Sequence, residues 1–151
     1  MGIRSSVFKN NEHIPLQYTC AGKNSNPPLI FTDTPEKTKS LVLIVEDITA
    51  TPKPWIHWLV FNIPKRTTHV KENEIPKGGT EGYANGGTFG YEGPCPKYFN
   101  GTHRYVFRLY ALDTIIYTPK TLDKEILKPL VKGHIIEEAQ LVGLCEGKKA
   151  E

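Results

Sequence analysis

The sequence has no long apolar segment. No stretch approaches the roughly 18 consecutive apolar residues that a membrane-spanning helix needs. Met1 to Asn10 also lacks the apolar centre of a secretory signal peptide, so we expect a cytoplasmic protein. There is no internal repeat, low-complexity tract or change of composition that would mark a domain boundary. Residues 1–151 are therefore predicted to form a single domain.

Cysteine is scarce, and its spacing does not suit a metal site. Cys20, Cys95 and Cys145 lie far apart and include no CxxC pair, which argues against zinc. An odd number of cysteines in a reducing compartment indicates free thiols. Cys95 lies between two prolines, and nothing in the sequence around it would activate it. We therefore expect a packed thiol there.

Neither sign of charge dominates the chain. Its 19 basic and 16 acidic side chains give a formal net charge of +3, and the basic residues are dispersed. A surface that binds nucleic acid usually gathers its basic residues into a patch or stripe. We therefore do not expect a DNA or RNA partner.

Glycine and proline are abundant, with 13 and 12 residues respectively, and they follow no repeat. This distribution is typical of turns between many short elements. The prolines of the first third favour brief edge strands. Residues 75–101 are rich in glycine and predict a long loop, and Tyr83, Phe89 and Tyr91 indicate that this loop packs against the domain.

Three segments have the pattern of core strands. Ser40–Val45 is a continuous apolar run after its first residue, as expected for a strand buried on both faces. The other two segments alternate. In the first, one face carries His57, Leu59, Phe61 and Ile63, and the other carries Trp58, Val60 and Asn62. In the second, one face carries Tyr105, Phe107, Leu109 and Ala111, and the other carries Arg104, Arg108 and Tyr110. A mainly β fold of packed antiparallel sheets follows.

The C-terminal third has helical patterns. Thr121 is expected to cap a helix whose apolar stripe is Leu122, Ile126, Leu127 and Leu130. Pro129 should kink that helix or end it early. After Gly133, the segment His134–Gln140 is expected to form a second short helix, and Leu141–Cys145 a strand or tail.

Five side chains carry the candidate chemistry. Asp47 follows the first predicted core strand and His57 begins the second, so antiparallel pairing would bring them to the same rim of the sheet. Trp55 has the same parity as His57. His103 and Tyr105 share parity at the start of the third strand. We therefore predict that these five side chains line one rim pocket.

Such a pocket suits an anion. Imidazole and phenol groups can donate hydrogen bonds to phosphate oxygens, and Asp47 can hold a histidine in the donating tautomer. Backbone amides near Gly93 can approach an anion closely, and Trp55, Pro94 and Pro96 would supply apolar walls. A metal triad or acid–base catalysis on a phosphate ester is disfavoured, because no activated serine, cysteine partner or second pocket carboxylate is evident.

Several segments occur together in an order that is highly specific. They are Tyr18–Pro28, Leu41–Asp47, Trp55–Pro64, Gly90–Pro96, His103–Leu112 and Gly133–Gly143. In this order the sequence resembles the phosphatidylethanolamine-binding protein family, whose relatives include the Raf kinase inhibitor proteins. The resemblance covers about Val7 to Gly147, and Gly93-Pro-Cys-Pro96 looks like the prokaryotic branch.

The resemblance implies two packed sheets with peripheral helices and a small pocket that accepts phosphate-like groups, with no cofactor. The pocket residues that it implies are Asp47, Trp55, His57, Gly93, Pro94, Pro96, His103 and Tyr105. The chain departs from the family pattern at Thr49, which replaces a second aspartate, and at Thr51, which replaces a proline. Cys145 stands where a tyrosine is common.

The resemblance also implies a function. We expect a non-enzymatic binding or regulatory protein that takes up a phospholipid head group or a phosphorylated partner. The alternative is a protein inhibitor of a kinase or of a serine protease. The prokaryotic branch is compatible with a homodimer, although no exposed apolar stripe in the sequence demands one.

Overall fold

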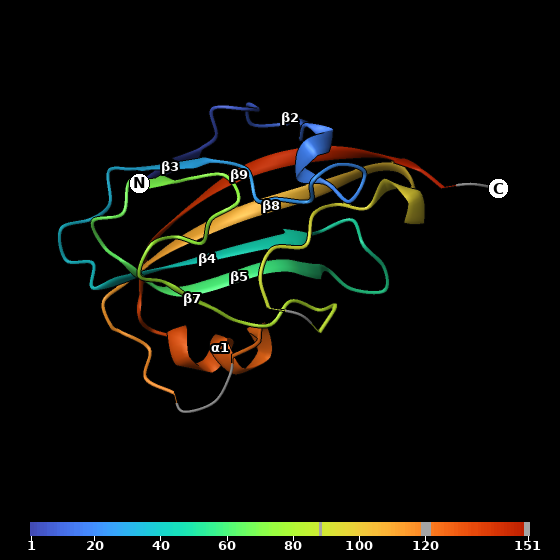
Figure 1. The fold of residues 1–151 in the computed structure, drawn as a ribbon. Helices are drawn as coiled ribbons and strands as arrows, with labels where there is room; N and C mark the ends of the chain where they lie inside the picture. The colour runs from blue at the N-terminus through green and yellow to red at the C-terminus, as the bar shows by residue number, and fades with distance from the viewer. Residues whose placement is uncertain (88, 119–121, 150–151) are drawn as a thin grey trace.

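The computed structural model describes residues 1–87, 89–118 and 122–149. It contains a six-stranded sheet, in the order β2-β9-β8-β4-β5-β7, and a three-stranded sheet, in the order β1-β3-β6 (Figure 1). The strands of the larger sheet are β2 (Glu12–His13), β4 (Ser40–Asp47), β5 (Trp55–Pro64), β7 (Thr80–Glu81), β8 (Asn100–Leu112) and β9 (Ile135–Lys148). Those of the smaller sheet are β1 (Gly2–Arg4), β3 (Leu29–Thr32) and β6 (His69–Val70). All pairings are antiparallel except that of β2 with β9. The predicted mainly β fold is confirmed.

The larger sheet is buried on both faces at its centre. Every residue of β4 is buried, as the apolar run predicts. One face packs against the smaller sheet, with Phe31 of β3 and Phe107 of β8 in the same core cluster. The opposite face packs against the single described helix, α1 (Lys124–Val131), whose Leu127 joins Val42 and Leu59 (Figure 1).

The alternation predicted for β8 is correct. Tyr105, Phe107, Leu109 and Ala111 all lie in the core between the two sheets. Tyr110 packs on the opposite face, beside the helix cluster.

The alternation predicted for β5 is wrong at both ends, because β5 contains two bulges. Val45 pairs with Trp58 and Glu46 pairs with Ile56, so His57 is an extra residue on its strand. Its ring therefore lies against Tyr105 in the core between the sheets. The prediction placed the His57 ring on the same face as Leu59, and that prediction is wrong.

The second bulge of β5 lies near its other end. Leu41 pairs with Ile63 while Leu43 pairs with Val60, and Asn62 between them has a φ of 53°. Ile63 consequently lies in the same core cluster as Val60. The prediction grouped it with the residues of the opposite face.

The predicted helix is present, with a different start. Asp123 is the N-cap, and its carboxylate accepts a hydrogen bond from the Ile126 amide. Thr121 lies outside the described residues. The helix ends at Val131, two residues after Pro129, in agreement with an early end. Of its apolar side chains Leu127 is buried, while Leu130 remains 37% exposed, so the predicted stripe is only partly covered.

The second predicted helix, His134–Gln140, is wrong. Residues Ile135–Lys148 form β9, which pairs with β8 from Leu112 to Asn100. The long free edge of β8 offers hydrogen-bond partners to every other backbone group of this segment, and that tertiary pairing outweighs the local helical pattern.

The loop predicted between residues 75 and 101 is confirmed. Its described part contains β7 and the one-turn 3-10 helix Pro96–Tyr98, and its last two residues, Asn100 and Gly101, already belong to β8. Tyr91 packs against the core between the sheets. Tyr83 and Phe89 instead stack on each other, with ring centroids 4.1 Å apart, and stay partly exposed.

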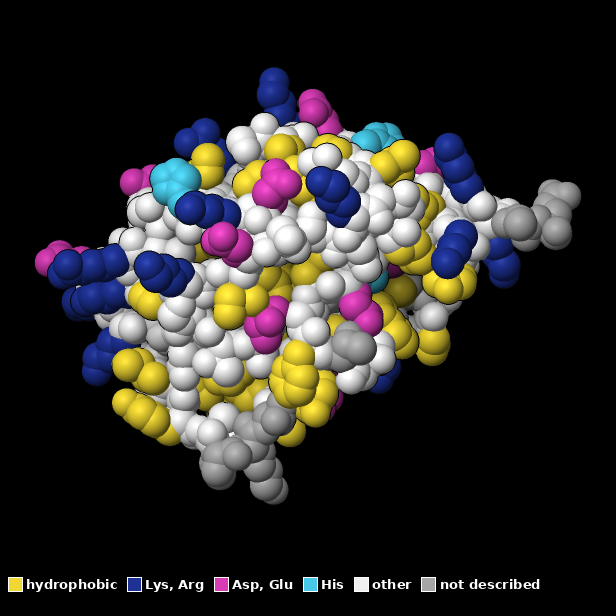
Figure 2. Space-filling model, in the orientation of Figure 1, with side chains coloured by type: hydrophobic (Ala, Val, Ile, Leu, Met, Phe, Trp, Pro, Cys, Tyr) yellow, Lys and Arg dark blue, Asp and Glu magenta, His cyan; other side chains and the backbone are white. Residues whose placement is uncertain are grey.

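On the face drawn in Figure 2, basic and acidic side chains are intermingled. None of the helices in the described part of the chain has the length and apolar character required to span a bilayer.

Candidate functional site

A cavity of about 410 Å³ opens at the end of the larger sheet where β4 stops and β5 and β8 run alongside it. Asp47 pairs in register with Trp55 on one side and with Tyr105 on the other. The lining residues are Cys20, Asn24, Asp47, Ala50, Trp55, His57, Glu92, Gly93, Cys95, Tyr98, Phe99 and Tyr105. The structure therefore brings Asp47, Trp55, His57, Gly93 and Tyr105 together, as predicted.

The other three predicted residues do not line the cavity. His103 lies behind Asp47, and Pro94 and Pro96 are buried in the loop that carries Cys95. Their contribution is to hold the residues that do line it.

Asp47 organises one side of the cavity. Only 4% of the residue is exposed, and its Oδ2 lies 2.6 Å from Nδ1 of His103. Its Oδ1 accepts hydrogen bonds from the amides of Thr49 (2.9 Å) and Ala50 (3.1 Å). Because a carboxylate only accepts, the proton of this pair lies on His103 Nδ1. The His103 ring also stacks on Phe99, with centroids 3.7 Å apart.

Thr49, where the sequence differs from the expected pattern, has a structural role. The Thr49 hydroxyl accepts a hydrogen bond from the amide of Arg104 at 3.0 Å. It thereby ties the loop after β4 to the start of β8, beside the Asp47–His103 pair.

His57 is held in one tautomer. Its Nδ1 lies 2.6 Å from the carbonyl oxygen of Glu92, which can only accept, so Nδ1 carries the proton. Burial lowers the pKa of His57 below its ordinary value and outweighs the opposing effects of Glu92 and Asp47. The ring is therefore neutral at pH 7, and its Nε2 is a hydrogen-bond acceptor.

Tyr105 supplies a hydroxyl that keeps its proton. Burial, with a further contribution from the charge of Asp47, raises the pKa of the phenol far above its ordinary value. Its ring meets the His57 ring edge-on, with centroids 5.1 Å apart. The phenol thus keeps its hydrogen and donates it to Asp47, beside the imidazole.

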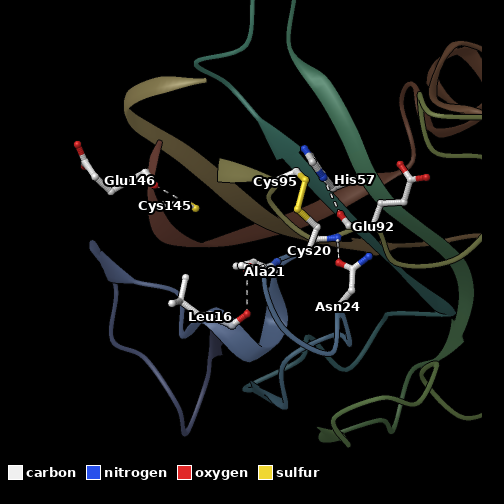
Figure 3. The surroundings of a disulfide bond; sticks show 11 residues. Leu16, Cys20, Ala21, Asn24, His57, Glu92, Cys95, Cys145 and Glu146 are labelled. Carbon is white, nitrogen blue, oxygen red and sulfur yellow. Dashed lines mark hydrogen bonds between the residues drawn. A yellow bond between two sulfur atoms is a disulfide. The ribbon is translucent and has the colours of Figure 1, made fainter. Parts of the chain in front are cut away.

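Two of the cysteines form a disulfide, so the prediction of free thiols is wrong for them. Cys20 and Cys95 are 75 residues apart in sequence, yet their Cα atoms are 5.0 Å apart, and the bond lies next to His57 and Glu92 (Figure 3). Sequence spacing could not show this, because the pairing depends on how two long loops fold against each other. Cys145 is free, in agreement with the prediction, and it is buried. The packed free thiol that was expected at Cys95 is wrong.

Three hydrogen bonds join the same two loops. The Cys20 amide donates to the carbonyl of Pro94 (2.9 Å), and the Tyr91 hydroxyl donates to the carbonyl of Tyr18 (2.7 Å). The Gly93 amide donates to Oδ1 of Asn24 (2.8 Å). That amide was expected to face an anion, and this hydrogen bond occupies it instead.

The disulfide makes a direct prediction about thiol reactivity. After unfolding without a reductant, only one thiol per chain, that of Cys145, should react with an alkylating reagent. In the native protein it should react more slowly by a factor on the order of 100, because burial raises the pKa of Cys145 to about 11 and shields its sulfur. Mass spectrometry after alkylation measures both results. Three reactive thiols in the unreduced, unfolded chain would contradict the disulfide.

The charges around the cavity are few and mostly negative. Among the described residues that line it there is no Lys or Arg, and Glu92 adds the second carboxylate that the sequence did not reveal. Trp55, Tyr98 and Phe99 supply an aromatic wall; only the first was predicted. Within the described residues, no group of three or more His, Cys, Asp or Glu side chains is placed to hold a metal ion.

Comparison with known proteins identifies relatives across the whole length. A family model described as "Phosphatidylethanolamine-binding protein" matches residues 4–146. A UPF0098 protein of Methanothermobacter thermautotrophicus is 43% identical over 149 residues, which cover 95% of this chain and 97% of that protein. A UPF0098 protein of Chlamydia trachomatis is 38% identical over 151 residues, with 97% and 99% covered.

Two solved structures are closely similar. One is described as a putative phosphatidylethanolamine-binding protein homolog from Chlamydia trachomatis; it has a TM-score of 0.91 at 37% identity and covers 97% of each chain. The other is Escherichia coli YbcL, described as a member of the mammalian family of these proteins. Its TM-score is 0.88 at 27% identity, with 97% of this chain and 98% of that chain covered.

Proposed function

The chain belongs to the phosphatidylethanolamine-binding protein family, and on that premise we propose that its cavity binds a phosphate-like anion without chemical turnover. Family membership itself indicates a binding or regulatory role. The proposed ligand is the phosphate group of a phospholipid head group or of a phosphorylated partner.

The observation that carries the proposal is the convergence of His57, Tyr105 and Asp47 at one end of a cavity whose other walls are largely aromatic. The polar atoms of a small anion would meet the imidazole and the phenol, while the rest of the ligand would lie against Trp55 and Tyr98. A cavity of about 410 Å³ is within the range of small-molecule sites.

The way the anion is held follows from the charges. Because the described lining residues include no Lys or Arg, hydrogen bonds hold the anion, and ion pairs contribute little. The Tyr105 hydroxyl donates to Asp47 in the cavity as it stands, and it becomes one donor to the ligand by turning its hydrogen toward the anion. His57 Nε2 becomes a second donor only when the ring takes up a proton. In the neutral ring, Nε2 accepts a hydrogen bond from a protonated oxygen of the ligand. A phosphate monoester fits this arrangement, because its second pKa is about 6 and it can share a proton near neutral pH.

The alternative function, inhibition of a kinase or a serine protease, would use surface loops. A panel of proteases assayed with excess protein would detect such inhibition.

Replacing His57 by alanine tests the proposal. We expect the Kd for inorganic phosphate to rise at least tenfold, because the variant loses the imidazole that faces the ligand. The free energy of unfolding should fall by no more than about 1.5 kcal/mol, the range of the single lost hydrogen bond to Glu92. Phosphate titration followed by NMR and urea denaturation measure the two quantities.

The matched control is His69→Ala, since His69 is exposed on β6 and does not line the cavity. This variant should bind phosphate as the wild type does. A His57→Ala protein that binds normally but has lost most of its stability would show that the histidine is structural, and the proposal would be wrong.

A further inference from the structure

Cys20 and Cys95, which the disulfide joins, both line the cavity, beside the residues proposed to hold the ligand. We infer that this disulfide is a redox-sensitive element that sets the affinity of the cavity for its anion. The oxidised protein is the tight-binding form, and reduction by a dithiol weakens binding. The inference rests on the proposed function of the same cavity.

The loop that carries Cys20 and the loop that carries Cys95 are joined in one way near Gly93 and in another way where they face the cavity. At the end near Gly93, the hydrogen bonds from Tyr91 to Tyr18 and from Gly93 to Asn24 bring the backbones into close contact. A Cβ atom on Gly93 would lie within 2.6 Å of Asn24 Oδ1. This end does not need the disulfide to stay closed.

The end that faces the cavity depends on the disulfide. Of the three hydrogen bonds named between the loops, the one from the Cys20 amide to Pro94 lies nearest to it, and that bond holds backbone rather than side chains. Beyond Cys95 the chain continues through the short 3-10 helix to Tyr98 and Phe99, both of which line the cavity. The disulfide is thus the covalent constraint closest to this wall.

Reduction changes the wall directly. A thiolate of the dithiol attacks one sulfur, the S–S bond breaks, and a mixed disulfide forms. The second thiol of the reductant resolves it, leaving two cysteine thiols and the oxidised, cyclic reductant. Two electrons and two protons are transferred to the protein. Bonded sulfurs are about 2.0 Å apart, whereas unbonded heavy atoms need about 3.5–4.0 Å, so the two sulfurs must separate by roughly 1.5 Å.

The displacement reaches the aromatic wall through the chain after Cys95, which carries Tyr98 and Phe99. Glu92, which fixes the ring of His57, lies on the other side of Gly93, where the hydrogen bonds between the loops remain (Figure 3). Freedom gained at Cys95 therefore loosens the aromatic wall, while the imidazole stays in place. Binding must then order the wall again, and that ordering lowers the affinity.

The position of the bond also gives a reductant access to it. Cys20 and Cys95 are both partly exposed, and both line an open cavity. Cys145, in contrast, is 3% exposed and lies in the core between the sheets. A small dithiol can therefore reach the disulfide without unfolding the protein, and the three hydrogen bonds between the loops preserve the fold afterwards.

The test is to titrate the full chain with inorganic phosphate before and after reduction with dithiothreitol, an uncharged dithiol that does not compete for an anion site. We expect the Kd to rise at least fivefold on reduction and to return after reoxidation. Cys95→Ser should reproduce the reduced value with or without dithiothreitol. Cys145→Ala, which keeps the disulfide, should respond to reduction as the wild type does. Far-UV circular dichroism should show that the reduced protein remains folded.

The outcomes separate the two proposals. If the oxidised protein binds no phosphate, the proposed function fails, and this inference fails with it. If oxidised and reduced proteins bind phosphate equally, the anion site stands and the redox inference alone is wrong. Loss of the native spectrum on reduction would also overturn it, since the bond would then be a structural cross-link.

Discussion

Replacing Gly93 by valine is expected to abolish phosphate binding and to lower the free energy of unfolding by about 3 kcal/mol. A Cβ at this position would lie 2.6 Å from Asn24 Oδ1 and closer still to the carbonyl oxygen of Tyr18. The Tyr18 carbonyl is part of the backbone of the loop that faces Gly93, so it cannot move away without separating the two loops. The hydrogen bond from the Gly93 amide to Asn24 would be lost as well.

Binding should fail because the same separation moves Glu92, whose carbonyl fixes His57. Urea denaturation and a phosphate titration measure the two effects. Gly101→Ala is the control: a Cβ there meets nothing within 4 Å, but the backbone has a φ of +78°. The free energy of unfolding of that variant should fall by only roughly 1–2 kcal/mol, the cost of a left-handed backbone at a residue other than glycine. Its Kd for phosphate should not change. Normal phosphate binding by Gly93→Val would show that contact between the loops does not shape the cavity.

The centre of the fold was predictable because its pattern is simple. Ser40–Val45 is apolar along most of its length, and a strand buried on both faces has little alternative. Tyr105 to Ala111 alternates without a bulge in its pairing with β4, so parity gives the correct faces. The meeting of Asp47 with Trp55 and Tyr105 follows from antiparallel neighbours alone.

The rest depended on features that parity does not encode. The bulge at His57 turns its ring toward Tyr105, and the left-handed Asn62 reverses Ile63, so a rule of period two fails at both places. Residues 135–140 carry two isoleucines and two glutamates whose spacing suits a helix as well as a strand. Only the open edge of β8 decides between them.

Parts of the candidate site were hidden for a related reason. Cys20 and Cys95 belong to irregular loops, and neither their spacing nor their neighbours indicates that these loops meet. Glu92 and Tyr98 lie in the same glycine- and proline-rich region, where no periodicity tells which side chains face inward. Their proximity to the Gly93-Pro-Cys-Pro96 segment was the only available signal.

A second large effect is expected on the opposite face of the sheet, at Glu46. This carboxylate is 5% exposed and accepts hydrogen bonds from Arg108 Nε (3.0 Å) and Lys124 Nζ (2.8 Å), so it joins β4 to β8 and to α1. Glu46→Gln would leave two cations near apolar side chains without a counter-charge. We expect the free energy of unfolding at pH 7 to fall by about 3 kcal/mol, the lower end for breaking a buried pair, because both cations can partly reach water.

The pH dependence of that loss identifies its source. Burial alone would raise the pKa of Glu46, but the hydrogen bonds and charges of Lys124 and Arg108 together hold it below the ordinary value of 4.5. Its stabilisation is therefore complete above about pH 4.5 and is lost as the pH falls through the lower pKa of the folded state.

Protonated glutamic acid and glutamine are nearly the same in size and charge, so the wild type and Glu46→Gln should converge in stability at acid pH. Urea denaturation at pH 7 and pH 3 measures the gap, and Glu138→Gln, at an exposed position of β9, should show almost none at either pH. A gap that stays constant between the two pH values would show that the side chain's packing, and not its charge, holds α1 to the sheet.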